Sequence, residues 1–431
     1  MSADSGKHFF KQAGWLVAAN LGCGLFMFAV HPIAATMEAA EYGVFQTLLK
    51  LFILLGIPAA GLQAVLALQT ATAKEPVAQA DLAATVRSLL WSMSALWLVM
   101  FLAGWAASDV ICETLKIGNP KALLATLGLG LTTLWLPILR GVLQGRQDFA
   151  GLGWTLVIDG IGRFGMVVVL VLLLGGQAAS GMSASLFSQF VAVALAWYAT
   201  REVRAVPGGT FVWRPWLARV VPLTLGLGAV IFIGAADTLF VQSQFDRELT
   251  RLYGAGVIVG FGLSQFTLPL ASVMFPKIAG GAGNGQDAAL RHTLLGTLAL
   301  GGAVAAVCSM KPTWPLRIVY FRNPDELLPA APLVPWFVWS ILGLVLANVL
   351  VQNLLARERF AIVPWLVIIA AGFAGGLWWV QPKLTGLEPM VAFGLVVKVL
   401  AVACVALLGT AIFFTWGRDG GPKSKVQESK A

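Results

Sequence analysis

Apolar runs long enough to cross a bilayer recur along the whole chain, separated by short joints that carry charged residues, proline or glycine. A transmembrane helix needs about 20 mostly apolar residues. Because exposed backbone polar groups cannot face lipid, each run must form a helix or a broken helix sheltered by its neighbours. The sequence therefore predicts an all-α integral membrane protein with about 12 transmembrane helices. The predicted spans cover residues 13–35, 42–69, 84–108, 122–143, 150–174, 182–200, 217–241, 252–276, 289–310, 331–355, 361–381 and 390–415.

The composition excludes a water-soluble fold. Hydrophobic residues make up 58% of the 431 residues and charged residues 11%, against about 25% charged in a soluble domain. Twelve spans and their joints use almost the whole length, so we expect no appended soluble catalytic domain. The cysteines Cys23, Cys112, Cys308 and Cys404 are scattered singly. We interpret them as apolar filler rather than as a disulfide framework or a zinc site.

The basic residues predict the orientation of the chain. If both termini and the even-numbered joints lie on one side, that side carries 18 Lys and Arg residues and the other carries 8. The positive-inside rule then puts both termini in the cytoplasm. No basic stripe interleaved with aromatic residues lies on a polar segment, so the net charge of +9 does not indicate a nucleic-acid partner. The 18 basic residues on the side of the termini are Lys7, Lys11, Lys74, Arg87, Arg140, Arg146, Arg201, Arg204, Arg214, Arg219, Lys277, Arg291, Arg357, Arg359, Arg418, Lys423, Lys425 and Lys430. The 8 on the opposite side are Lys116, Lys121, Arg247, Arg251, Lys311, Arg317, Arg322 and Lys383.

An internal repeat at an offset of 211 residues divides the chain in two. Tyr42-Gly43 and Tyr253-Gly254 are each followed by a proline sixteen positions after the tyrosine. The joint at 143–150 aligns at the same offset with the joint at 354–361, with Leu, Arg, Phe and Ala shared. Bilayer physics alone places tyrosine at interfaces and arginine in cytoplasmic turns, but it does not explain the equal spacing.

Six spans in each half is an even number, so both halves enter the membrane from the same side and form a parallel repeat. We expect an N-terminal six-helix lobe over 1–204, a cytoplasmic linker over 205–216, a C-terminal six-helix lobe over 217–416 and a disordered cytoplasmic tail over 417–431. Two equivalent bundles around a central cleft can rock between two tilts of similar energy. The repeat therefore indicates an alternating-access transporter.

Ionisable side chains inside the spans are the candidate functional residues, because each costs about 2.5–3.5 kcal/mol near the bilayer centre. We expect Lys50, Arg163 and Lys398 to line the cleft and to bind an anionic substrate. Asp159 and Arg163 lie four residues apart on one helical face, where they can form an ion pair. The sequence leaves open whether this pair is structural or whether Arg163 contacts substrate while Asp159 holds it or exchanges a proton. Snorkelling or a structural ion pair is the alternative for Lys50.

Asp237 and His31 are candidates for coupling transport to an ion gradient. Asp237 lies near the outer end of its span, where a solvated position is the alternative. His31 precedes Pro32, which loosens a helix, and imidazole titrates near neutral pH. The alternative for His31 is an ordinary interface residue.

Five segments occur in a distinctive order along the chain: Ala40 to Phe45, Leu143 to Phe149, Asp237 to Val241, Tyr253-Gly254, and Met274 to Ala279. Each segment taken alone is a motif of low specificity, and none is catalytic. In this order and spacing they resemble the polysaccharide-flippase family of the multidrug/oligosaccharidyl-lipid/polysaccharide (MOP) exporter superfamily. The resemblance covers nearly the whole chain.

The resemblance implies two six-helix lobes in a V and a flippase rather than an enzyme. Its substrate would be an undecaprenyl-pyrophosphate-linked oligosaccharide, moved from the cytoplasmic to the outer leaflet of a bacterial inner membrane for surface polysaccharide biosynthesis. A polysaccharide polymerase and glycosyltransferases are the implied protein partners. A proton or sodium gradient would supply the energy without a cofactor, and the sequence has no Gly-x-x-x-x-Gly-Lys-[Ser/Thr] phosphate loop.

Three alternatives remain. A lipid II flippase typically has two helices more than this chain. A multidrug exporter of the same superfamily would carry an acidic coupling residue in the first span, where no Asp or Glu precedes Glu38. A polytopic polymerase or glycosyltransferase needs a sizeable outer loop, but the longest predicted outer connection runs only from about Lys311 to Ala330.

Overall fold

The computed structural model describes residues 3–280, 284–321 and 324–417, with side chains over 14–265, 290–321 and 324–417. All regular elements in these ranges are helices. Lys7, Lys11, Lys277, Pro269 and Met274 to Ala279, which entered the predictions above, lie outside the described side chains. The tail predicted over 417–431 lies, beyond Gly417, outside the described residues.

Helices follow one another along both halves of the chain, joined by short turns. The first half contains α1 (Ala3–Ala34), α2 (Ala39–Leu55), α3 (Leu62–Thr72), α4 (Pro76–Ala106), α5 (Ser108–Thr114), α6 (Pro120–Gly145), α7 (Phe149–Val167), α8 (Ala178–Ala199) and α9 (Arg201–Ala205). The second contains α10 (Trp213–Ile233), α11 (Ala236–Gln244), α12 (Arg247–Gly280), α13 (Asn284–Met310), α14 (Thr313–Val319), α15 (Val334–Ala356), α16 (Val363–Leu384) and α17 (Pro389–Trp416).

The predicted spans agree with these helices. Eleven helices in the described part of the chain are long and apolar enough to cross a membrane. The remaining predicted span, 252–276, falls within α12, part of whose side chains are not described. The all-α prediction with about 12 spans is therefore confirmed.

Local sequence signals set several helix boundaries. Pro76, Pro120 and Pro389 stand in the first turns of α4, α6 and α17, where a missing N–H costs nothing because that group has no intrahelical partner. The side chain of Asp148 accepts from the backbone N–H of Gly151 and caps α7.

Two spans are interrupted, which apolar patterning alone did not predict. The second span contains a short 3-10 turn at Ile57–Ala59 between α2 and α3, where Pro58 removes a backbone donor. The seventh, predicted as one helix over 217–241, is divided into α10 and α11 at Gly234 and Ala235. Ala235 has the non-helical angles φ −134° and ψ −31°.

The repeat is visible in the backbone of two equivalent turns. Gln147 and Glu358, which are 211 residues apart, both have positive φ, at 58° and 54°. In the first turn the N–H of Asp148 donates to Leu143, at 2.9 Å, and in the second the N–H of Arg359 donates to Leu354, at 3.0 Å. A left-handed conformation is uncommon for residues other than glycine, so its recurrence at the repeat offset supports a duplicated unit.

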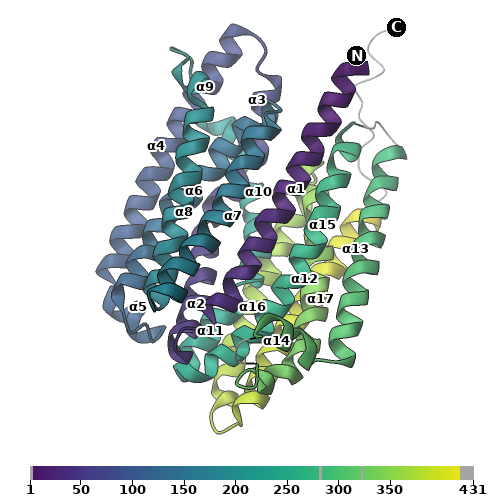
Figure 1. The fold of residues 1–431 in the computed structure, drawn as a ribbon. Coiled ribbons are helices and arrows are strands. Elements are labelled where there is room, and N and C mark those ends of the chain that lie inside the picture. The colour runs from purple at the N-terminus through teal and green to yellow at the C-terminus, as the bar shows by residue number, and fades with distance from the viewer. Residues whose placement is uncertain (1–2, 281–283, 322–323, 418–431) are drawn as a thin grey trace.

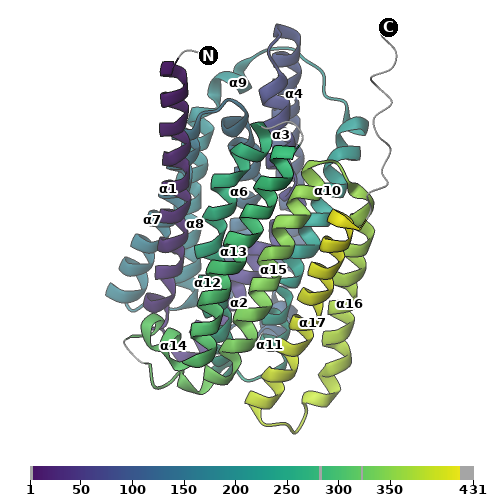
Figure 2. The same ribbon diagram turned by 90° about the vertical axis from the view of Figure 1, so that its right-hand side faces the viewer.

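The helices form two bundles side by side (Figure 1). In that view α4, α5, α6, α8 and α9 lie on the left, and α12, α13, α15 and α17 lie on the right. Figure 2 shows that α1 begins and α17 ends at the same end of the molecule, which we call the termini end. Helices α5 and α14 lie at the opposite end, called here the far end.

Each bundle has its own hydrophobic core, and a third cluster joins them. Leu66 and Leu139 belong to the N-terminal core, and Leu366 belongs to the C-terminal core. The third cluster includes Phe45 of α2 and Ala255 of α12. The two lobes are therefore packed together through α1, α2 and α12 rather than being separate bodies.

The linker between the lobes is held against α4 of the N-terminal lobe. The guanidinium of Arg87 donates to the carbonyls of Arg204, Val206 and Gly208 at 2.7–3.0 Å. Asp81 accepts from the backbone N–H of Thr210 at 2.7 Å. These contacts attach the linker to one lobe.

Candidate functional site

A cluster of three charged side chains, of which two are buried and Arg140 is partly buried, lies inside the N-terminal lobe. Asp159 of α7 accepts from Arg163, one helical turn later, with 3.2 Å between Oδ1 and Nη2. Its other oxygen, Oδ2, is 3.6 Å from Nη2 of Arg140 on α6. Arg140 also donates to the hydroxyl and the carbonyl of Thr155, both at 3.1 Å. Two guanidiniums thus share one carboxylate, and this triad has a net single positive charge because arginine stays protonated in proteins.

Arg163 is the less satisfied of the two arginines. Only 5% of the residue is exposed, and its guanidinium stacks over the ring of Phe52 at 5.6 Å. Within the described part of the chain, its Nε has no hydrogen-bond partner. A buried guanidinium N–H without an acceptor is costly, so this donor is available to an anion that enters the lobe.

Lys50 and His31 lie between this cluster and the other lobe. The positive charges of Lys50 and Arg163 both interact electrostatically with the buried His31 ring. His31 packs edge-on against Phe261 of α12, with the ring centroids 6.2 Å apart. In the described structure its Nδ1 has no hydrogen-bond partner. The sequence-predicted residues Lys50, Arg163, Asp159 and His31 therefore lie in one region.

Asp237 lies on the C-terminal side of the same region. It is 2% exposed, and its carboxylate accepts from the hydroxyl of Tyr253 at 2.7 Å. The Asp237 carboxylate also interacts electrostatically with the Lys50 ammonium of the other lobe. The solvated position considered for Asp237 is therefore wrong in this conformation, because the break between α10 and α11 turns the start of α11 inward.

Lys398 lies elsewhere. It is exposed on α17, and its ammonium lies over the ring of Trp336 on α15 at 5.5 Å. Within the described part of the chain, the structure brings it to none of the other candidate residues. Its position in the middle of an apolar run predicted burial or a cavity, but that pattern does not define which face of the helix bears the charge.

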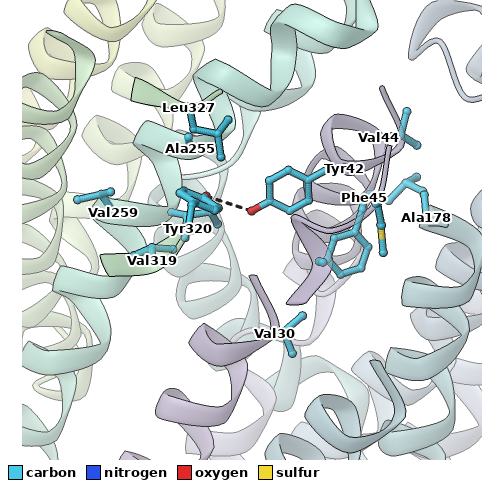
Figure 3. Close-up of a cluster of buried hydrophobic side chains, with 14 of the residues drawn as sticks. Val30, Tyr42, Val44, Phe45, Ala178, Ala255, Val259, Val319, Tyr320 and Leu327 are labelled. Atoms are coloured by element: carbon cyan, nitrogen blue, oxygen red, sulfur yellow. Dashed lines mark hydrogen bonds between the residues drawn. The ribbon is translucent and has the colours of Figure 1, made fainter. Parts of the chain in front are cut away.

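Three contacts between the lobes, which we call the far-end interface, lie beside this charged region. The hydroxyls of Tyr42 and Tyr320 are 3.0 Å apart, and Figure 3 shows them pointing at each other from α2 and from the segment after α14. The hydroxyl of Thr47 lies 3.3 Å from Oε1 of Gln242, to which it donates. The third contact runs from the Lys50 ammonium to the Gly234 carbonyl at 2.8 Å.

Further contacts strengthen this closure. The Lys116 ammonium donates to the Phe245 carbonyl, and the Gln242 amide donates to the Leu115 carbonyl at 3.0 Å. Gly254 packs against the side chain of Gln46 so closely that an added Cβ would overlap it. The lobes are thus tightly joined through α2, α11 and α12.

Sequence reasoning missed two contributors to this site. Arg140 was counted with a cytoplasmic joint because it lies five residues before the end of α6, yet its side chain points inward to Asp159. The signal that could have found it is the pairing of Thr155 and Asp159 one turn apart on α7. Tyr320 lies in a predicted outer connection, where no local pattern indicated burial.

No metal site accompanies this cluster in the described residues, where no group of three or more His, Cys, Asp or Glu side chains could hold an ion. The side chains present in the cluster can form ion pairs and hydrogen bonds through their arginine, lysine and carboxylate groups.

Comparison with solved structures defines the fold. A multidrug resistance MATE family transporter of the MOP superfamily, in its outward-facing conformation, superimposes with a TM-score of 0.64 at 14% identity, covering 95% of this chain and 97% of that chain. The chain has the MOP transporter fold. The inward-facing conformation gives a TM-score of 0.61 at 14% identity over 93% of this chain and 94% of that chain. A MOP superfamily transporter from Pyrococcus furiosus, described by a reversed polarity of its binding pocket, gives 0.64 at 13% identity over 94% and 96%.

Neither the protein-family models nor the curated proteins include a match to this chain. The structural neighbours thus confirm the superfamily fold that the sequence resemblance predicted. The polysaccharide-flippase family within that superfamily stays a prediction.

Proposed function

We propose that this chain is a membrane transporter that moves a polyprenyl-pyrophosphate-linked oligosaccharide from the cytoplasmic leaflet to the outer leaflet of a bacterial inner membrane. In this proposal the termini end faces the cytoplasm, as the positive-inside rule predicts, and the far end faces outward. The observation that carries the proposal is the net-positive triad of Arg140, Asp159 and Arg163, in which Asp159 and Arg163 are buried, together with Lys50, which acts on the same His31 ring as Arg163.

The charge of this cluster suits a pyrophosphate. Burying a positive charge inside a membrane protein is costly unless a counter-charge or a function requires it. Arg163 has a free Nε within the described structure, and arginine binds phosphate oxygens through charge-assisted hydrogen bonds. A sugar headgroup with a pyrophosphate cannot cross hydrocarbon unaided. Cationic side chains between the lobes would lower that barrier while the polyprenyl chain stays in lipid.

The driving force is proposed to be a proton or sodium gradient, with Asp159, Asp237 and His31 as the candidate coupling residues. Asp159 and Asp237 lie on opposite lobes, and each carboxylate accepts a hydrogen bond within its own lobe, from Arg163 and from Tyr253 respectively. A polysaccharide polymerase and glycosyltransferases, which consume and supply the lipid-linked sugar, are the proposed partners.

Export of small molecules is the second candidate function, and the MATE neighbours favour it. The polarity of the buried cluster argues against cationic drugs as the cargo, because the triad would repel them. The Pyrococcus furiosus neighbour bears on this point, since its reversed pocket polarity is described as suggesting a different function for that protein.

Ligand-dependent stability distinguishes these two functions. The purified protein is heated in nanodiscs with undecaprenyl pyrophosphate, with undecaprenol as the uncharged match, or with ethidium as a cationic drug. A ligand at 100 times its Kd stabilises the folded state by about 2.7 kcal/mol. We expect stabilisation by the pyrophosphate alone, and its loss in Arg163→Ala but not in Lys398→Ala. Stabilisation by ethidium without any effect of the pyrophosphate would instead establish the second function.

A further inference from the structure

The Lys50 ammonium makes a contact that the anion-binding role does not require. It donates to the Gly234 carbonyl at 2.8 Å, and this bond joins α2 of the N-terminal lobe to α10 of the C-terminal lobe. Gly234 follows the last residue of α10, where carbonyl groups lack intrahelical partners. The negative end of the helix dipole also favours a cation there. The break between α10 and α11 therefore creates an acceptor for Lys50.

This bond belongs to the closed far-end interface. Thr47, one turn before Lys50 on α2, is buried and donates to Gln242 of α11. Further along the same helix, Tyr42 meets Tyr320 (Figure 3). Opening the far end requires α2 to separate from α11, and so requires Lys50 to leave Gly234.

Lys50 also shares an electrostatic environment with Arg163, the residue proposed to hold the anionic headgroup. Its charge and that of Arg163 both act on His31, so the two cations belong to the same polar region. A phosphate oxygen is a stronger acceptor for an ammonium than a neutral carbonyl, because both groups are charged. An anion held by Arg163 can therefore compete with Gly234 for the lysine.

We propose that Lys50 couples headgroup binding to the opening of the far end: its bond to Gly234 keeps the far end closed, and the headgroup phosphate opens that end by taking Lys50 away. This inference rests on the proposed function for the identity of the anion. The closing role of Lys50 is independent of it. Asp237, whose carboxylate accepts from Tyr253, is a second C-terminal group that attracts the lysine electrostatically while the lobes are together.

The test measures how fast a thiol-reactive maleimide labels a cysteine at position 47. Thr47→Cys is made in a chain whose four native cysteines are replaced by alanine, and labelling is followed in nanodiscs. In the closed state the reporter is covered by Gln242. Lys50→Met removes the ammonium and keeps the chain length, Lys50→Arg restores a cation, and Lys398→Met removes an exposed lysine as a matched control.

Without ligand, we expect Lys50→Met to label about tenfold faster than its parent, equivalent to about 1.4 kcal/mol in favour of the open state. Lys398→Met should label at the parental rate, and Lys50→Arg should lie between the parent and Lys50→Met. Equal labelling of Lys50→Met and its parent overturns the closing role, whatever the substrate. Lys50→Met is judged to be folded if its melting temperature matches that of its parent. If it melts early, slower labelling of Lys50→Arg than of Lys50→Met supports the closing role, and equal labelling of the two overturns it.

With undecaprenyl pyrophosphate, the parent should label faster, undecaprenol should have no effect, and Lys50→Met should not respond further. A response to the pyrophosphate that persists in Lys50→Met overturns the coupling step while leaving the proposed function intact. Absence of both binding and response in the parent, together with fast ligand-free labelling of Lys50→Met, rejects the proposed substrate and retains Lys50 only as the closing contact.

Discussion

Replacing Asp159 by asparagine should destabilise the N-terminal lobe strongly. The carboxylate lies between two guanidiniums, at 3.2 Å from Arg163 and 3.6 Å from Arg140. Removing one partner of a buried ion pair costs about 3–5 kcal/mol, because it leaves an uncompensated charge. Arg140 keeps its bonds to Thr155, so most of this loss falls on Arg163. Its remaining contact with Phe52 contributes only about 0.5–2 kcal/mol.

The free energy of unfolding is measured by SDS titration in mixed micelles. We expect Asp159→Asn to lose about 3–5 kcal/mol, and the double variant Asp159→Asn/Arg163→Gln to recover most of that loss. The exposed pair of Arg146 and Glu202 supplies the control, since Glu202→Gln should change stability by no more than about 1 kcal/mol. Equal stabilities of Asp159→Asn and Glu202→Gln would refute the buried triad. Transport that stays lost in the stable double variant assigns Asp159 a direct role as well.

Three further outcomes are expected. Arg163→Ala should abolish complementation of a flippase-deletion strain at an unchanged membrane level, whereas Arg163→Lys should keep part of it; full activity of the alanine variant contradicts anion binding there. Gly254→Val places a side chain into Gln46 across the contact between the lobes. The maleimide labelling rate of the cysteine at position 47 should therefore increase several-fold, and an unchanged rate contradicts the closure. Tyr253→Phe removes a donor from the buried Asp237 and should cost about 1–3 kcal/mol in the same SDS titration; a neutral effect argues that the carboxylate is protonated or hydrated.

The membrane fold could be predicted from the sequence because lipid imposes one requirement on every span. Each apolar run had to satisfy its own backbone groups, so length and composition were sufficient to locate the helices. The joints at 143–150 and 354–361 also indicated the repeat, and their turns share the same backbone hydrogen bonds. The break at Gly234 was not predictable in the same way, because glycine is frequent in transmembrane helices and so does not by itself mark a break.

Site residues could be predicted where a charged residue lies deep in a span. They could not be predicted where the direction of the side chain determines whether the residue reaches the site. Lys50, Asp159 and Arg163 could be found because burying a charge needs a reason. Arg140 was missed because its distance along the chain from a helix end does not say whether its side chain extends outward or inward. Lys398 shows the converse, since a charge in the middle of an apolar run lies exposed on the outside of α17.

Leaflet accessibility in liposomes tests the central claim most directly. The protein is reconstituted with an undecaprenyl-pyrophosphate-linked oligosaccharide, and an enzyme outside the vesicles reports the headgroups that reach the outer leaflet. Runs with and without a proton or sodium gradient define the driving ion. We expect gradient-dependent movement by the wild type, its loss in Lys50→Ala and Arg163→Ala, and normal rates in Lys398→Ala. Wild-type rates in both cluster variants, or no movement of this substrate by any form of the protein, would contradict the role of the buried cations.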